Sequence, residues 1–236
     1  MMRTIGTRLA PFVTSVALLV GLLLYAPSTR VTQYHALTAG APLSRVAVVG
    51  DSYTNGTAIG GQGGNAWPVR AWRTLARQGV PVNADVAAEG RAGYGARGDQ
   101  GNLFGDLVPR AVKPDDALVV FYGSRNDQGI DPNALSGQIF NAFSLAHGIA
   151  PTARLLVIGP PWPTADVPPA VLQIRDILAF QSVLAGATFI DPIAERWFVD
   201  RPDLIGPDGV HPTDAGHVYM ADMIAPLIGG QLPRRV

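Results

Sequence analysis

The sequence contains no cysteine among its 236 residues. This excludes disulfide bonds, thiolate catalysis and thiolate metal sites. Charged residues are also scarce, at 15% of the chain, and 18 basic residues balance 18 acidic ones. A chain without net charge lacks the basic footprint that is typical of nucleic-acid binders, so we expect no nucleic-acid partner.

Hydrophobic residues are plentiful, at 47% of the chain. A chain of this composition can bury a sizeable core and is not expected to be disordered. Its length suits one ordinary domain and is short for two.

The N-terminal segment, residues 1–26, differs from the rest of the chain. Arg3 and Arg8 precede an apolar stretch of about 18 residues, which is near the lower limit for a membrane span. We therefore expect a signal anchor or transmembrane segment. Pro27 disfavours cleavage at the end of this stretch; a cleaved signal peptide and a buried core helix are the alternatives. The basic residues before the apolar stretch predict an exported protein, either membrane-anchored with an extracytoplasmic domain or secreted. Residues 27–44 are expected to be a tether.

From residue 45 to residue 236 the sequence alternates between two patterns. Short apolar runs that are typical of buried strands occupy residues 45–50, 81–87, 117–123, 154–159 and 187–191. Helical spacing occupies residues 67–79, 134–149, 169–184 and 213–228. The alternation predicts an α/β domain: a five-stranded parallel sheet covered on both faces, in a three-layer α/β/α sandwich. Such sheets bind ligands at the carboxyl ends of their strands.

Polar residues and glycines follow the first three of these strands. Ser52 comes directly after the first strand, where it is either a nucleophile or a helix N-cap. Gly90 follows the second, where a glycine brings its backbone N–H close to a ligand or simply makes a turn; Gly93 is an alternative. Asn126 follows the third and is either an oxyanion donor or part of an Asx turn.

His211 is the histidine best placed for catalysis among the four in the chain. It lies in a loop before the last expected helix, and Asp208 precedes it by three residues. That spacing lets the carboxylate reach Nδ1 and leaves Nε2 available to accept a proton from a serine hydroxyl. A metal site at these two residues would need further ligands, and none lies at a suitable spacing.

Together these segments resemble the four sequence blocks of the SGNH hydrolases, also called GDSL esterases and lipases. The blocks here are Gly50-Asp51-Ser52-Tyr53, the segment ending at Gly90, Gly123-Ser124-Arg125-Asn126-Asp127, and Asp208-Gly209-Val210-His211-Pro212-Thr213. The resemblance covers residues 45–229 and implies the flavodoxin-like fold of that family. The third block has one residue more between its glycine and its asparagine than the usual pattern.

The resemblance implies a serine esterase or lipase that cleaves acyl or acetyl esters through an acyl-enzyme. Ser52, His211 and Asp208 would form the catalytic triad, with the oxyanion held by the backbone N–H groups of Ser52 and Gly90 and by the Asn126 amide. No cofactor or metal is implied. The alternative with the same residues is an O-acetyltransferase acting on cell-envelope glycan. An inactive glycan-binding domain and a flavodoxin-like cofactor binder are further alternatives, but the four site residues are intact and no phosphate-binding loop is present.

Several other features near the expected site have two interpretations each. Arg125 either meets an anionic substrate or forms a surface salt bridge. Trp67, Tyr53 and Tyr94 either line an apolar pocket for an ester substrate or pack in the core. The glycine-rich residues 55–65 form either a rim over the site or an insertion. The sequence makes no prediction of oligomeric state.

Overall fold

The structure, a computed structural model, describes residues 32–35 and 43–233 of the chain. The expected signal anchor over residues 1–26 lies outside the described residues. Among the residues that are described, no helix combines the length and the hydrophobicity that a membrane span requires.

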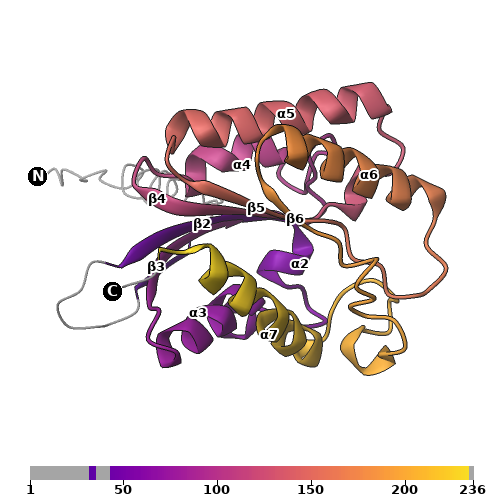
Figure 1. Ribbon diagram of the computed structural model, residues 1–236. Coiled ribbons are helices and arrows are strands. Elements are labelled where there is room, and N and C mark those ends of the chain that lie inside the picture. The colour runs from indigo at the N-terminus through magenta and orange to yellow at the C-terminus, as the bar shows by residue number, and fades with distance from the viewer. Residues whose placement is uncertain (1–31, 36–42, 234–236) are drawn as a thin grey trace, which may run out of the picture. The chain divides into compact units, whose positions relative to one another are not determined.

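A six-stranded sheet forms the middle layer of the domain (Figure 1). Its strands, in chain order, are β1 (Thr32–His35), β2 (Ser44–Gly50), β3 (Val82–Ala88), β4 (Asp116–Tyr122), β5 (Arg154–Ile158) and β6 (Thr188–Ile190). In space their order is β1-β3-β2-β4-β5-β6. Strands β2 to β6 pair in parallel, which confirms the predicted five-stranded parallel sheet.

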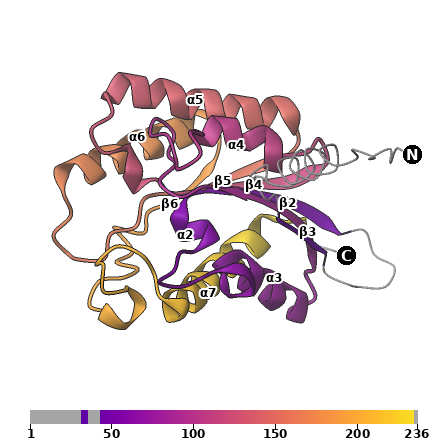
Figure 2. The same ribbon diagram turned by 180° about the vertical axis from the view of Figure 1, so that it is seen from behind.

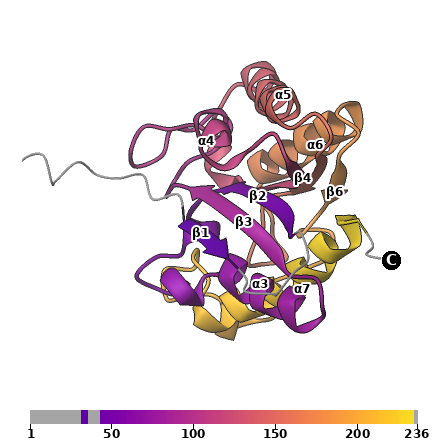
Figure 3. The ribbon, with the colours of Figure 1, turned by 90° about the vertical axis from the view of Figure 1, so that its left-hand side faces the viewer.

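Strand β1 is a sixth, antiparallel strand at the edge of the sheet, paired with β3 (Figure 3). It falls within residues 27–44, which we expected to be a tether throughout. The segment Thr-Gln-Tyr-His has no apolar run, so its strand conformation depends on the open edge of β3 and not on a local pattern.

Helices cover both faces of the sheet (Figures 1 and 2). One face carries α4 (Phe104–Ala111), α5 (Pro132–Ile149) and α6 (Pro169–Leu184), and the other carries α3 (Trp67–Arg77) and α7 (Asp214–Gln231). The four helices predicted from spacing are all present, and α6 has the predicted bounds. Helix α4 and the four-residue α2 (Ser52–Asn55) were not predicted.

The two faces of β2 illustrate why the core has two halves. Val46 and Val48 pack with the residues of α3 and α7, whereas Ala47 and Val49 pack with those of α4 and α5. All four side chains are fully buried. Because successive side chains of a strand point to opposite faces, a strand between two helical layers must be apolar throughout.

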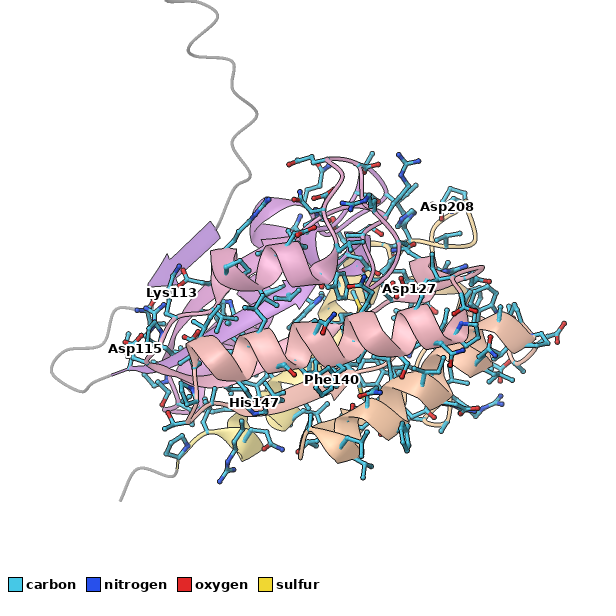
Figure 4. All side chains as sticks on the ribbon, turned by 90° about the horizontal axis from the view of Figure 1, so that it is seen from above. Lys113, Asp115, Asp127, Phe140, His147 and Asp208 are labelled. Carbon is cyan, nitrogen blue, oxygen red and sulfur yellow. The ribbon has the colours of Figure 1, made fainter. Side chains whose placement is uncertain are left out.

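Strand β2 lies between β3 and β4. From β2 the next strand, β3, is added on one side, whereas β4, β5 and β6 are added on the other, so the order of the strands reverses at β2. In the parallel register, Gly50 is level with Ala88 of β3 and with Tyr122 of β4. The segments that follow these three residues therefore begin side by side at one edge of the sheet. Figure 4 shows Asp127 and Asp208 at this end of the domain, with Lys113 and Asp115 at the opposite end. This is the position where open α/β sheets bind their ligands.

Candidate active site

Ser52 is the first residue of the short helix α2 and follows β2 after a single residue. That residue, Asp51, caps the helix: its Oδ1 accepts a hydrogen bond of 2.9 Å from the Tyr53 N–H. The Ser52 hydroxyl is therefore not used as the cap, which was the alternative interpretation of this serine. Its side chain remains available at the edge of the sheet, in a residue that is 7% exposed.

His211 joins Ser52 to Asp208 through its two ring nitrogens. Its Nε2 lies 3.1 Å from Ser52 Oγ, and its Nδ1 lies 2.6 Å from Asp208 Oδ2. The other carboxylate oxygen, Oδ1, accepts hydrogen bonds of 3.0 Å from the backbone N–H groups of Val210 and His211. Slight burial acts to raise the pKa of Asp208, but these bonds from the ring and the backbone outweigh it and lower the pKa to about 2.

The loop that carries His211 is fixed at further points. The Tyr53 hydroxyl donates a hydrogen bond to the Val210 carbonyl, and the Gly206 N–H donates one of 2.8 Å to the His211 carbonyl. Tyr53 follows the serine directly, so one side chain ties the serine turn to the histidine loop. The serine and the histidine are 159 positions apart in sequence, and the bond from Tyr53 to Val210 helps to keep their side chains close together.

Gly90 and Gly93 differ in whether the backbone N–H already donates a hydrogen bond within the protein. The Gly93 N–H donates a bond of 2.8 Å to the Ala96 carbonyl. The Gly90 N–H, like that of Ser52, donates to no other residue within the described part of the chain. The structure therefore favours Gly90 as a candidate backbone donor. A Cβ at Gly90 would lie 2.5 Å from Asp99 Oδ2, so a larger residue there would displace the Asp99 carboxylate.

Asn126 lies in a single 3₁₀ turn that follows β4, and its side chain points back toward the serine turn. Its Nδ2 donates hydrogen bonds of 2.9 Å to the Ala92 carbonyl and of 3.2 Å to Asp51 Oδ2. The amide therefore bridges the ends of all three segments, although the third block is one residue longer than usual. The Asx-turn alternative does not describe this side chain, because its contacts are with other segments of the chain.

Two acidic side chains near the site are buried: Asp51, which the sequence suggested as a structural residue that orders the serine turn, and Asp127, which was given no role. Asp127 accepts backbone N–H bonds of 2.8–3.0 Å from the three successive residues 94–96, which fixes the loop after β3. Burial raises the pKa of Asp127 and raises that of Asp51 to about 7. Asp127 is part of the third block, which was the available signal, but its three partners come from the loop after β3.

The glycine-rich segment 55–65 is held against the start of α7. Asp214 Oδ1 accepts a bond of 2.8 Å from the Gly61 N–H, and the buried His217 lies against the same glycine. His217 Nδ1 in turn accepts a bond of 3.2 Å from the Trp67 N–H. Burial lowers the pKa of His217 to about 4, so this ring is neutral near pH 7 and serves as a structural acceptor.

Of the two interpretations of the three aromatic residues near the site, packing in the core is the one that the structure supports. Tyr53, Trp67 and Tyr94 are each at most 1% exposed and pack against other core side chains. A cavity of about 380 Å³ lies beside the histidine loop, with a mixed lining that is mainly apolar. It is lined by Pro163, Thr164, Ala165, Val199, Asp200, Arg201, Pro202, Ile205, Gly206 and Gly209. Proline, valine and isoleucine here gave no periodic signal because they come from irregular loops.

A metal site is not apparent in residues 32–35 and 43–233, which contain no cluster of three or more histidine or acidic side chains suited to an ion. The chemistry that the assembled residues can perform is proton transfer and nucleophilic attack by a hydroxyl.

The parallel α/β sheet and the contact between a serine, a histidine and an aspartate at the ends of its strands are features of a class of hydrolases. Residues 48–219 match the GDSL-like lipase/acylhydrolase family, and the chain belongs to this family, the SGNH hydrolases. It is accordingly a carboxylic-ester hydrolase.

One relative and two solved structures illustrate the similarity. The GDSL lipase Rv0518 of Mycobacterium tuberculosis is 58% identical over 229 residues, which cover 96% of this chain and 99% of the relative. A family two carbohydrate esterase from Clostridium thermocellum, in complex with cellohexaose, has a TM-score of 0.63 at 17% identity. That match covers 83% of this chain and 66% of the esterase. The esterase EstA from Pseudoalteromonas has a TM-score of 0.61 at 12% identity. That match covers 79% of this chain and 97% of EstA. At these identities the two structures support the fold alone.

Proposed function

We propose that the protein hydrolyses acyl esters with Ser52 as nucleophile, His211 as general base and Asp208 as the residue that orients the histidine. The observation that carries this proposal is the chain of two contacts from Ser52 Oγ to His211 Nε2, at 3.1 Å, and from His211 Nδ1 to Asp208, at 2.6 Å. The first distance suits transfer of the serine proton to His211, and the second suits a hydrogen bond that holds the ring in the required tautomer.

In the first half of the reaction, the Ser52 oxygen attacks the ester carbonyl while His211 accepts its proton. The Asp208 carboxylate keeps the proton of the imidazole on Nδ1 and stabilises the imidazolium that forms. His211 then gives the proton to the leaving alcohol, and an acyl-enzyme remains on Ser52. In the second half, His211 activates a water molecule that releases the acid.

The charge that develops on the carbonyl oxygen is stabilised by the backbone N–H groups of Ser52 and Gly90 and by the amide of Asn126. The first two N–H groups have no other acceptor among the described residues. Asn126 already holds the Ala92 carbonyl at 2.9 Å, and its longer contact with Asp51, at 3.2 Å, is the one that an oxyanion would replace. A donor of this kind contributes about 3 kcal/mol to lowering the barrier.

The substrate we propose is an ester of an acyl chain. The relative at 58% identity is named a GDSL lipase, which supports a fatty acyl ester. The mainly apolar cavity beside the histidine loop has room for part of such a substrate, at about 380 Å³.

We further propose that the catalytic domain acts outside the cytoplasm, either anchored to the membrane or secreted. Support comes from Arg3 and Arg8, which precede the apolar stretch in residues 1–26. The full-length chain should appear in the membrane fraction or the medium of the expressing cells, with the domain open to added protease. Recovery of all the protein from the cytosol would contradict this proposal.

The test of the proposed activity is hydrolysis of a p-nitrophenyl ester series, from acetate to palmitate, by the full-length chain and by Ser52→Ala. We expect activity in the first and none in the second, and the dependence on chain length distinguishes an acetylesterase from a lipase. Equal activity in the two proteins would exclude Ser52 as the nucleophile. Release of p-nitrophenol only when a sugar acceptor is present, with an acetylated sugar in place of the free acid as product, would indicate an O-acetyltransferase instead.

A further inference from the structure

Arg125 lies at the edge of the active site, directly before Asn126 in the turn that follows β4. Its guanidinium carbon is 4.1 Å from the centre of the Trp162 ring, in a cation–π contact. The Trp162 ring is itself fixed, because its Nε1 donates bonds of 3.2 Å to Thr164 Oγ1 and of 3.0 Å to the Asp166 carbonyl. Two residues from different loops thus form one ordered pair.

The guanidinium also lies close to the serine turn. Burial raises the pKa of Tyr53 to about 12, and the nearby Arg125 offsets part of this rise. The charge of Arg125 likewise acts against the rise in the pKa of Asp51. Since Asp51 and Tyr53 flank Ser52 in the sequence, Arg125 stands beside the nucleophile as well as beside Asn126.

The surroundings of Arg125 satisfy only part of its hydrogen-bonding capacity. Arg45, Arg175 and Arg201 each pair with an aspartate. Within the described part of the chain, Arg125 has no such partner, and its Nη1 is buried without an acceptor. The neighbouring Tyr53 hydroxyl gives its proton to the Val210 carbonyl, and its oxygen accepts from another N–H of the Arg125 guanidinium. A buried guanidinium N–H without an acceptor lowers the stability of the folded chain. Such a group beside a nucleophile therefore points to a ligand that supplies the acceptor.

We propose that Arg125, held by Trp162, binds an anionic group of the ester substrate, a carboxylate or a phosphate. This inference rests on the proposed function. When a guanidinium stacks on a ring, its N–H groups stay in the guanidinium plane and point outward from its edge. These donors match the paired oxygens of such an anion. Stacking also fixes the side chain before the ligand arrives, which reduces the entropy lost on binding.

The position of Trp162 links this anion site to the cavity of about 380 Å³, because the next three residues, 163–165, line it. A substrate that occupies both would carry a negative charge near its ester bond and an apolar group beyond it. The negative charge lies in either the acyl part or the alcohol part of the ester. One pair of substrates, a charged ester and its neutral counterpart, tests each part.

The experiment measures kcat/KM of the full-length chain on matched esters. For the acyl part, the pair is the p-nitrophenyl monoester of glutaric acid and its methyl ester. For the alcohol part, it is 4-acetoxybenzoate and its methyl ester. We expect the anionic member of one pair to be preferred by about tenfold to 100-fold, the range of a charge-assisted hydrogen bond. Arg125→Gln should lower kcat/KM for that member by about ten times more than for its neutral partner.

The matched control is Arg77→Gln, an exposed arginine at the end of α3, which should retain the wild-type preference. The inference is overturned if neither pair shows a preference for the anion in the wild-type chain. It is also overturned if Arg125→Gln lowers both members of the preferred pair equally, because that result describes a residue that only positions Tyr53 and the histidine loop.

A binding measurement separates failure of this inference from failure of the proposed function. Calorimetry with the Ser52→Ala chain should detect the uncleaved anionic ester and not its neutral partner, and adding Arg125→Gln should abolish the binding. Binding that depends on Arg125 in a wild-type chain without hydrolytic activity would refute the proposed function and leave the anion site standing. Equal binding with and without Arg125 would refute the anion site.

Discussion

Replacing Asp208 with asparagine should lower kcat for ester hydrolysis by about 10²–10³-fold. The asparagine can keep one oxygen as the acceptor for the backbone N–H groups of Val210 and His211, so the loop is expected to fold as before. Its amide nitrogen would then face His211 Nδ1, in place of the carboxylate oxygen at 2.6 Å. Two donors cannot pair, so the ring would be held in the wrong tautomer and its positive charge would lose its partner.

The magnitude follows from the exposure of this carboxylate. In a fully buried triad the same exchange costs about 10⁴-fold in kcat. The Asp208 side chain is 35% exposed, so water takes over part of its role and the effect should be smaller. The expected loss corresponds to about 3–4 kcal/mol of transition-state stabilisation.

The assay is steady-state hydrolysis of a p-nitrophenyl ester, with circular dichroism to check that the variant is folded. Asp203→Asn is a suitable control, because Asp203 lies in the same segment and pairs with the exposed Arg201 instead of the histidine. The control should retain full activity. A folded Asp208→Asn protein with kcat within threefold of the wild type would refute the assigned role of this carboxylate.

Three other variants probe different parts of the account. Asn126→Ala should lower kcat about 10²–10³-fold with little change in KM, and an unchanged kcat would remove it from the oxyanion site. Gly61→Ala should lower the melting temperature by several degrees, since its Cβ would lie 1.9 Å from His217 Nε2 at a φ of +76°, and an unchanged value would contradict that packing. Because the pKa of Asp51 is raised from 3.8 to about 7, the folded chain holds the proton of this carboxyl more tightly than the unfolded chain does. The contribution of the protonated carboxyl to the free energy of unfolding is therefore complete below about pH 4 and is lost as the pH rises through 7. Asp51→Asn should therefore flatten the fall in the free energy of unfolding over this range in urea titrations, and an unaltered pH profile would argue against the raised pKa.

The sheet was predictable because its parallel strands are apolar on both faces. A run such as residues 45–50 is buried between two helical layers, so its composition alone identifies it. Helix α4 escaped prediction because Gly105 and Pro109 weaken its local helical pattern. Strand β1 is polar in sequence and forms on the edge of β3, a partner about 50 residues away that no local pattern reveals.

The site was predictable to the extent that its chemistry is local. Asp208 and His211 are three residues apart, and their spacing alone suggested a contact. The choice between Gly90 and Gly93 required the structure, because it depends on whether the Ala96 carbonyl occupies the N–H of Gly93. The sequence likewise left the role of Arg125 open, since neither the Trp162 stack nor the buried Nη1 is visible in a motif.

The most direct test of the central claim is to trap the nucleophile. The full-length chain is treated with an alkyl p-nitrophenyl phosphonate, which transfers its phosphonyl group to an activated serine, and the modified peptide is identified by mass spectrometry. The account predicts one phosphonyl group on Ser52, no label in Ser52→Ala, and labelling of His211→Ala slowed by at least about 100-fold. Labelling of another residue, or equal labelling of the Ser52→Ala chain, would contradict it.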